Sequence, residues 1–224
     1  MKIILGIDTT LDQCSVALLK GTECISDSQQ MHRGHAEILM PKIIALLKKA
    51  DVSFSDLNMI AVTVGPGSFT GLRVGLATAK GLSLAGQIPL VGFKTFEILA
   101  HCMPVLEQEE RNLLVAIDSL RADIYCQLYN PQLVEVKPAA TIFPEDILDY
   151  TGIKDLRVIG NGTQALKEQL SLHPNVLFQE VEASLSSQVL CQMASKLFPL
   201  VYQDIDLRAC QPFYLRPPDV TLPK

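Results

Sequence analysis

The residues best suited to chemistry in this sequence form a glycine-rich segment from Val64 to Gly75, which reads VGPGSFTGLRVG. A β-branched apolar run precedes the segment and helix-compatible residues follow it, so the pattern predicts a strand, a tight turn and a helix. Such a unit directs several backbone N–H groups and the positive end of a helix dipole at one point, which suits an anion. Gly65, Gly67 and Gly71 permit the backbone conformations and close approaches that the turn needs. These residues are consistent with a phosphate site and equally with a turn that only packs the helix on the sheet.

The segment does not match the standard nucleotide-binding or nucleophile motifs. The Gly-Lys-Ser/Thr of a Walker A loop is absent, Lys80 lies too far along the helix, and the G-x-G-x-x-G spacing of a dinucleotide turn is missing. Ser68 lacks the G-x-S-x-G context of a hydrolase nucleophile. We therefore expect Ser68 and Thr70 to cap the following helix, at about 1 kcal/mol each when well placed. Arg73 would meet an anion or pair with an acid, and the structural role is favoured.

An internal repeat predicts the architecture that positions this segment. Residues 4–19 read as a buried strand ending in Asp8 and a hydroxyl, a short polar turn and a second strand. Residues 114–129 repeat that pattern 110 positions later, with Asp118 at the position of Asp8. A repeat of about half the chain favours two lobes, each of which mixes sheet and helix.

We expect an N-terminal lobe at residues 1–108, which carries the glycine-rich turn, and a C-terminal lobe at 109–224, whose tail after residue 211 packs back across the first lobe. Apolar periodicity and helix start signals place the elements of each lobe. The predicted strands span residues 2–8, 14–20, 22–31, 58–64, 112–118, 123–129, 133–142 and 156–160. The predicted helices span residues 36–50, 69–86, 95–107, 144–151, 162–171 and 184–198.

The composition indicates a globular protein without membrane spans. Of the 224 residues, 48% are hydrophobic and 19% are charged, which is ordinary for such proteins. No apolar run approaches the ~20 residues of a transmembrane helix, and the N-terminus predicts a first strand instead of a signal peptide. Six cysteines without a C-x-x-C pair favour free thiols in a reducing cytoplasm. The net charge of −5, with no basic cluster beyond Lys48-Lys49, argues against autonomous binding of nucleic acid.

Six motifs are distributed along nearly the whole chain: Gly6-Ile-Asp-Thr-Thr10, His35-Ala-Glu-Ile-Leu-Met-Pro41, Gly65-Pro-Gly-Ser-Phe-Thr-Gly-Leu-Arg73, Asp118–Tyr125, Gly160-Asn-Gly162 and Tyr214-Leu-Arg216. With them the chain resembles one bacterial family, TsaB (formerly YeaZ), of tRNA threonylcarbamoyladenosine biosynthesis. The resemblance implies a cytoplasmic, non-catalytic subunit that pairs with TsaD, transiently engages the P-loop ATPase TsaE, reaches tRNA only through the complex, and forms a homodimer when alone. That assembly transfers a threonylcarbamoyl group from threonylcarbamoyl-AMP to adenosine at position 37 of tRNA.

The two strand–Asp–turn–strand hairpins are also similar to those of actin, sugar kinases and heat-shock chaperone ATPases. That resemblance implies an α/β, two-lobed actin-like ATPase (ribonuclease H-like) fold with duplicated mixed sheets flanked by helices. In that superfamily the hairpins hold nucleotide phosphates. ATP or ADP would then be bound, within the complex, by Asp8, Thr9, Thr10, Gly65, Gly67 and Ser68. Two features argue against that site: the added acid Asp12 in the first turn would repel a phosphate, and the second turn has Arg121 and Asp123 in place of a glycine-rich sequence. We expect that no cofactor is required.

The catalytic paralogue TsaD carries a His-x-x-x-His metal pair, and this chain has Thr95 and Leu99 at those positions, with Glu97 between them. A hydroxyl and a leucine cannot bind a divalent metal as two imidazoles do. The resemblance therefore implies an inactive paralogue without a metal site. His32 and His35 are three residues apart, whereas a helical zinc pair is four apart, so these histidines predict no metal site either.

Two predicted helices carry the candidate partner surface. Small residues recur every four positions on one face of the second helix, at Gly71, Gly75 and Ala79. Because glycine disfavours a helix, this pattern indicates that another backbone packs closely there, either from the sheet of the same lobe or from a partner helix. The helix near 36–50 has a wide apolar face. In proteins resembling TsaB, these helices form the surface shared with TsaD or with a second copy. That surface would include His35, Ile38, Leu39, Ile43, Leu46, Gly71, Arg73, Gly75, Thr78, Ala79 and Leu82.

Three other functions stay open on the sequence. A nucleotide-binding, kinase-like protein would share the fold and both hairpins, and would turn over ATP. A metallopeptidase would need histidine ligands that this sequence lacks at the expected positions. A self-sufficient homodimeric binding protein would use the same two helices on a second copy of itself.

Overall fold

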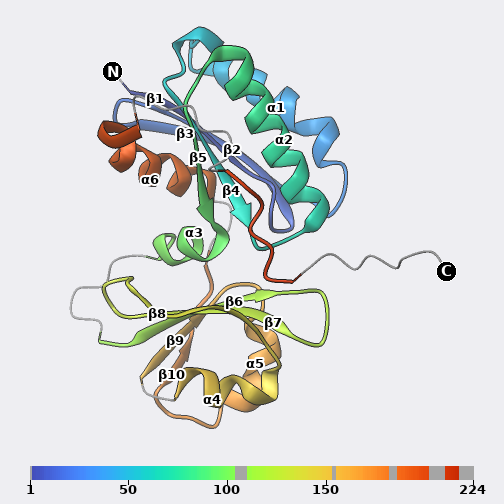
Figure 1. Cartoon of the computed structure of the whole chain (residues 1–224), viewed down its shortest axis with the longest axis vertical. Helices are drawn as coiled ribbons and strands as arrows, with labels where there is room; N and C mark the ends of the chain where they lie inside the picture. The colour runs from blue at the N-terminus through green and yellow to red at the C-terminus, as the bar shows by residue number, and fades with distance from the viewer. Residues whose placement is uncertain (1, 104–109, 153–154, 182–185, 202–209, 217–224) are drawn as a thin grey trace, which may run out of the picture. The chain divides into compact units, whose positions relative to one another are not determined.

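The chain divides into two compact units, each built on a five-stranded mixed sheet (Figure 1). Unit 1 comprises Met1–Val105 and Val181–Pro212, and unit 2 comprises Leu106–Glu180 and Phe213–Lys224. The computed structural model describes residues 2–103, 110–152, 155–181, 186–201 and 210–216. None of the helices among these residues is long and apolar enough to cross a membrane.

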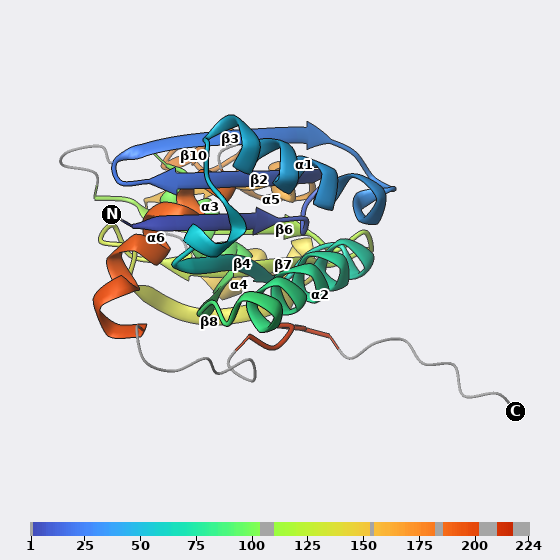
Figure 2. The ribbon, with the colours of Figure 1, turned by 90° about the horizontal axis from the view of Figure 1, so that it is seen from above.

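The sheet of unit 1 has the strand order β3-β2-β1-β4-β5. Figure 2 shows β3, β2, β1 and β4 in this order. β1 pairs with β2, and β2 with β3, in antiparallel fashion, whereas β4 is parallel to both β1 and β5. β1 and β4 are buried along their whole length because helices cover both faces of the sheet. The strands are β1 (Ile3–Asp8), β2 (Gln13–Lys20), β3 (Glu23–Gln30), β4 (Met59–Gly65) and β5 (Leu90–Lys94).

Helices α1 (His35–Lys49) and α2 (Phe69–Gly86) lie beside each other on one face of this sheet, and α6 (Ser186–Val201) lies on the other face (Figure 1). Successive side chains of a strand point to opposite faces. In β1, Gly6 faces α6, where the carbonyl of Ser187 leaves no room for a Cβ, and Ile7 faces α2 at Gly75. The short helix α3 (Thr95–His101) packs against α6, and a single 3-10 turn, η1 (Phe54–Asp56), precedes β4.

The sheet of unit 2 repeats this arrangement, with the strand order β10-β9-β6-β7-β8. β6 is antiparallel to β7 and parallel to β9, as β1 is to β2 and β4. The predicted repeat is therefore confirmed, and with it the predicted duplication of mixed sheets. The elements are β6 (Asn112–Asp118), β7 (Ile124–Tyr129), β8 (Glu135–Ile142), η2 (Pro144–Asp146), α4 (Ile147–Thr151), β9 (Leu156–Ile159), α5 (Thr163–Leu170) and β10 (Val176–Phe178).

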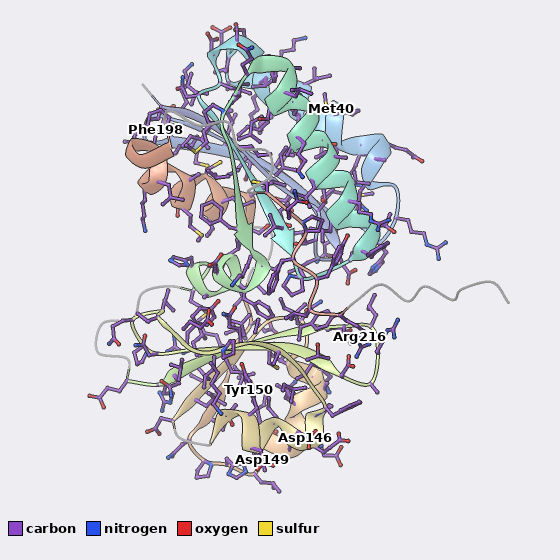
Figure 3. All side chains as sticks on the ribbon, in the orientation of Figure 1. Met40, Asp146, Asp149, Tyr150, Phe198 and Arg216 are labelled. Atoms are coloured by element: carbon purple, nitrogen blue, oxygen red, sulfur yellow. The ribbon has the colours of Figure 1, made fainter. Side chains whose placement is uncertain are left out.

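The prediction that residues 109–224 form one lobe is wrong for residues 181–212, which belong to unit 1. α6 packs on β1 and β2, where the hydroxyls of Ser187 and Ser15 share a hydrogen bond of 2.6 Å. Lys2 also holds α6, since its ammonium donates to the Ser195 carbonyl at 2.9 Å and lies 5.0 Å from the centroid of the Phe198 ring (labelled in Figure 3). The apolar stripe of α6 thus covers the first sheet instead of the second.

The tail stays with unit 1 as far as Pro212, and its predicted course across the first lobe is wrong for residues 213–216. Residues 213–216 belong to unit 2, and Arg216 (labelled in Figure 3) forms an ion pair with the buried Asp123 of that unit. Residues 217–224 lie outside the described residues.

Two strands were missed by the sequence analysis, and two predicted helices differ from the structure. β5 is interrupted by Gly92 and β10 has only three residues, so neither shows a clear alternating pattern. The helix predicted at 95–107 ends at His101, and residues 104–109 lie outside the described residues. The helix predicted at 144–151 divides into η2 and α4, because Pro144 begins a 3-10 turn.

Candidate functional site

The turn that follows β1 and the glycine-rich turn that follows β4 are joined by reciprocal hydrogen bonds. The Ser68 N–H donates to the carbonyl of Thr10 at 2.7 Å. In return the Thr9 hydroxyl donates to the carbonyl of Gly71 at 2.7 Å. Both bonds are short, and Thr9 and Thr10 are buried. The two turns therefore form one rigid unit at the start of α2.

Three glycines are required by this close approach. A Cβ added to Gly67 would collide with the Thr10 carbonyl, one added to Gly71 would collide with the Thr9 carbonyl, and one added to Gly75 would collide with the Thr9 hydroxyl. The small residues along α2 thus allow this helix to pack closely against the turn after β1 in the same unit. Of the two explanations that the sequence left open, this one applies to Gly71 and Gly75, and the expectation that these two glycines contact a partner is wrong.

The Asp8 carboxylate closes the first turn. It accepts hydrogen bonds from the Thr10 N–H at 3.0 Å and the Thr10 hydroxyl at 2.6 Å, with the Gln13 amide at 3.5 Å. Asp8 is 1% exposed. The polar groups of Asp8, Thr9, Thr10 and Ser68 thus have intramolecular partners, which favours the structural role of these turns. Binding of ATP or ADP by Asp8, Thr9, Thr10, Gly65, Gly67 and Ser68 stays a prediction.

The start of α2 differs in part from the expectation. Ser68 is the N-cap, and its hydroxyl accepts from the Gly71 N–H at 3.3 Å, as predicted. Thr70 is an exposed residue of the first turn, not a cap. Arg73 is exposed, and its guanidinium lies 3.7 Å from the centroid of the Phe69 ring, a cation–π contact on the same helix face.

The positions aligned with the TsaD metal pair are part of the packing of unit 1. The Thr95 hydroxyl donates to the Pro66 carbonyl at 2.5 Å, and Leu99 is buried. Glu97 caps α3, because its carboxylate accepts from the Lys94 N–H at 2.8 Å. This role of Glu97 was not predicted from the sequence. Among the described residues, no group of three or more His, Cys, Asp or Glu side chains is placed to hold a metal ion.

The second hairpin is closed differently from the first. Asp118, the counterpart of Asp8, is exposed, and its carboxylate accepts from the Leu120 N–H at 2.7 Å. The Ser119 hydroxyl donates to the carboxylate of Asp123 at 2.6 Å, and Arg216 pairs with the same carboxylate. Asp123, the acid that takes the place of a glycine-rich turn, therefore serves the packing of unit 2, whereas Arg121 of the same turn is exposed.

Four of the six cysteines are poorly suited to act as nucleophiles, whereas a hydrogen bond with Cys191 lowers the pKa of the Cys24 thiol. All six are free thiols, as expected. Burial raises the pKa of the Cys14 thiol to about 11 and that of the Cys102 thiol to about 12. Burial also raises the pKa of Cys126 and Cys191 well above the ordinary value. Such thiols stay protonated at neutral pH and are poorly reactive.

The predicted partner surface divides into an inner and an outer part. Seven of its residues are buried in unit 1, so they do not lie at the surface as the prediction requires: His35, Leu39, Ile43, Leu46, Gly71, Gly75 and Ala79. Four reach the surface at least in part: Ile38, Arg73, Thr78 and Leu82. The apolar stripes were identified correctly, but they are the inner faces of the two helices.

The outer face of the two helices carries apolar residues that the sequence analysis did not select. Ile44 is 59% exposed and Leu84 is 69% exposed, and Met40 (labelled in Figure 3) and Phe69 are exposed as well. Ala77, Gly81 and Ala85 are also exposed and recur every four residues along α2. We call these residues the outer α1–α2 face: Met40, Ile44, Phe69, Ala77, Gly81, Leu84 and Ala85.

Comparisons with known proteins agree with this architecture. The family model described as TsaD, tRNA N6-adenosine threonylcarbamoyltransferase, matches residues 25–202. The tRNA threonylcarbamoyladenosine biosynthesis protein TsaB of Bacillus subtilis (strain 168) is 31% identical over 174 residues, which are 75% of this chain and 74% of that protein. The chain belongs to the TsaB family.

Two further TsaB or YeaZ proteins illustrate the extent of the similarity. TsaB of Escherichia coli (strain K12) is 33% identical over 126 residues, 56% of this chain and 54% of that protein. In this and similar alignments the chain spans little more than half the length of the relative. The structure of YeaZ from Pseudomonas aeruginosa, at 25% identity, matches with a TM-score of 0.77 over 96% of this chain and all of that one.

Proposed function

We propose that this chain is a non-catalytic subunit of the apparatus that makes threonylcarbamoyladenosine at position 37 of tRNA, and that it acts in the cytoplasm by binding and activating TsaD. Its membership in the TsaB family supports this role, because the relatives are named for biosynthesis of that nucleoside. The observation that carries the proposal is the outer α1–α2 face. This face is apolar although it lies on the surface of unit 1.

The composition of the outer α1–α2 face fits a helical partner. Ile44 and Leu84 provide large apolar side chains that gain free energy when a partner removes them from water. Beside them, a Cβ added to Gly81 would meet nothing within 4 Å, so this side of α2 leaves room for a close-packed backbone. Aromatic and arginine side chains such as the stacked Phe69 and Arg73 are enriched in protein interfaces.

A non-catalytic role is supported by the residues at the TsaD metal positions. The Thr95 hydroxyl donates a hydrogen bond to the Pro66 carbonyl, and Leu99 is buried in the core, so neither side chain is available as a metal ligand. In the proposed complex TsaD supplies the metal and the active site, TsaE binds transiently, and tRNA is held through the complex. The net charge of −5 is consistent with leaving the RNA mainly to partners.

The test is reconstitution of tRNA threonylcarbamoylation from labelled threonine, bicarbonate and ATP, with the synthetase, TsaD and TsaE, in the presence or absence of this chain. We expect label in tRNA only when both TsaD and this chain are present. If label appears without this chain, the subunit role is wrong. Hydrolysis of ATP by the chain alone would instead support the kinase-like alternative.

A pair of exposed substitutions tests the surface. Ile44→Glu places a charge in the outer α1–α2 face, and we expect it to abolish co-purification with TsaD and to lower the labelling of tRNA at least tenfold. Leu172→Glu is the matched control, because Leu172 is 87% exposed and lies in unit 2. Sedimentation with and without TsaD shows whether a homodimer uses the same face, since Ile44→Glu then also yields a monomer. Equal effects of the two substitutions would contradict the assignment of this face.

A further inference from the structure

Two cysteine thiols contact each other where α6 packs on β3 in unit 1. β3 is an edge strand of its sheet, and on it Cys24 pairs with Leu19 of β2. Cys191 lies on α6, and a hydrogen bond joins its thiol to the thiol of Cys24. The two sulfur atoms are therefore neighbours, although the two residues lie far apart in the sequence.

The packing around α6 holds this pair of thiols in place. The Cys191 sulfur lies 3.5 Å from the carbonyl oxygen of Ile4, with which it forms a hydrogen bond. Three residues earlier on α6, the Gln188 amide donates to the Ser26 hydroxyl at 2.6 Å. Ser26 is two residues from Cys24 on β3, and residues two apart on a strand or three apart on a helix share a face. Both pairs therefore belong to one contact between α6 and β3.

The two thiols differ in exposure and in reactivity. Cys24 is partly exposed, whereas Cys191 is fully buried. The hydrogen bond with Cys191 lowers the pKa of the Cys24 thiol, and burial raises the pKa of Cys191 well above its ordinary value. Because the thiolate is the reactive form of cysteine, an oxidant attacks Cys24 first. An accessible thiol of lowered pKa beside a second thiol is the arrangement that converts an oxidised cysteine into a disulfide.

We propose that Cys24 and Cys191 are a redox modification site, at which hydrogen peroxide converts the two thiols into a disulfide that joins β3 to α6. In the first step the Cys24 thiolate attacks one peroxide oxygen, an S–O bond forms, the O–O bond breaks, and the released hydroxide takes up the proton that Cys24 lost. In the second step the Cys191 sulfur attacks the sulfur of the Cys24 sulfenic acid, and its proton leaves with the hydroxyl group as water. Two thiols are oxidised and one peroxide is reduced to two molecules of water.

The disulfide fastens α6 to the sheet that it covers. α6 belongs to the segment Val181–Pro212, which returns to unit 1 after the chain has formed most of unit 2. A disulfide between residues 24 and 191 therefore closes a long loop, and this restricts the unfolded chain more than the folded one. α6 lies on the face of the sheet opposite α1 and α2 (Figure 1), so the proposal does not rest on the proposed function or on the outer α1–α2 face.

The test is mild oxidation of the folded full chain with hydrogen peroxide, followed by unfolding in urea and alkylation with iodoacetamide. Mass spectrometry of the intact chain counts the alkylated cysteines, and we expect the number to fall from six to four and to return to six after reduction with dithiothreitol. Digestion with trypsin should yield peptide 21–33 linked to peptide 168–196, each of which contains one cysteine. Six alkylated cysteines after oxidation, or a disulfide between other cysteines in place of this one, would overturn the proposal.

Three serine variants separate the two steps. Cys24→Ser should leave every remaining cysteine open to alkylation after oxidation, and Cys191→Ser should stop the reaction at a sulfenic acid on Cys24, which dimedone traps. Cys102→Ser is the matched control, because Cys102 packs against the same apolar cluster as Cys24, and this variant should still form the disulfide. A disulfide that forms as readily in Cys102→Ser as in the unmodified chain supports the pair, whereas loss of the disulfide in Cys102→Ser would contradict it.

Two further measurements test the reactivity of Cys24 and the effect of the disulfide. Before oxidation, iodoacetamide should label Cys24 in the folded chain at least tenfold faster than Cys102, whose pKa burial raises to about 12. Equal rates would contradict the assignment of Cys24 as the first thiol to react. The oxidised chain should unfold at a higher urea concentration than the reduced chain, and Cys24→Ser should show no such shift. An unchanged midpoint would refute the fastening of α6.

Discussion

Gly75 and Gly81 lie on different sides of α2, and replacing each by alanine tests how that helix is seated. A Cβ on Gly75 collides with the hydroxyl of Thr9, whereas a Cβ on Gly81 meets nothing within 4 Å. The gain in intrinsic helix propensity is the same at both sites, up to ~1 kcal/mol. Any difference between the two variants therefore reports the packing of α2 against the turn after β1.

The magnitudes follow from the contacts at each site. At Gly75 the added methyl group overpacks a buried site, which costs about 1–3 kcal/mol. It also displaces the Thr9 hydroxyl from the Gly71 carbonyl, and losing that hydrogen bond costs about 1 kcal/mol. After the gain in propensity, Gly75→Ala is expected to lower the free energy of unfolding by about 1–3 kcal/mol. Gly81→Ala is expected to raise it by about 0.5–1 kcal/mol.

Urea unfolding followed by circular dichroism measures both variants against the unmodified chain, with the slope checked for constancy. A Thr9→Ala background removes the hydroxyl that the new Cβ meets, so the cost of Gly75→Ala should shrink there, as a double-mutant cycle would show. If Gly75→Ala is as stable as Gly81→Ala, then α2 is not seated on Thr9 and the structural explanation of the glycine stripe is refuted.

Three further predictions concern stability and reactivity. Ser68→Ala removes the N-cap of α2 and is expected to lower the free energy of unfolding by about 1 kcal/mol in urea titration, with Thr70→Ala as the neutral control. Arg216→Ala leaves the buried Asp123 carboxylate without its ion-pair partner and should cost about 1–3 kcal/mol. The raised pKa values of Cys14 (about 11) and Cys102 (about 12) mean that above the ordinary thiol pKa the folded chain holds protons that the unfolded chain releases. Stability should therefore fall as pH rises from about 9 towards 11, an effect that Cys14→Ser with Cys102→Ser should reduce. At pH 8 these two thiols should react slowly with iodoacetamide until urea unfolds the chain, and fast labelling of the folded chain would contradict their burial.

The local sequence pattern predicted the structure best in the two strand–turn–strand hairpins. The strands that end in Asp8 and Asp118 were identified because apolar residues, an acid and a hydroxyl recur in the same order, and the strand orders of the two sheets confirm the duplication. The short strands β5 and β10 contain too few residues to show an alternating pattern, so the sequence did not predict them. Gly92 interrupts the apolar pattern of β5, and β10 spans only three residues. Each of these strands therefore depends on pairing with a parallel strand, β4 or β9, from which a helix separates it in the sequence.

The sequence by itself determined the duplicated strand–turn–strand plan, the glycine turn that begins α2, and the absence of histidine at positions 95 and 99, because these depend on residue type and on contacts within a few residues. Only the tertiary structure decided what covers each apolar stripe. A period of 3.6 residues shows that one face of α1, α2 or α6 must be buried, but not which surface buries it. Hence α6 covers the first sheet, Gly75 meets Thr9 instead of a partner, and Ile44 and Leu84 face outward.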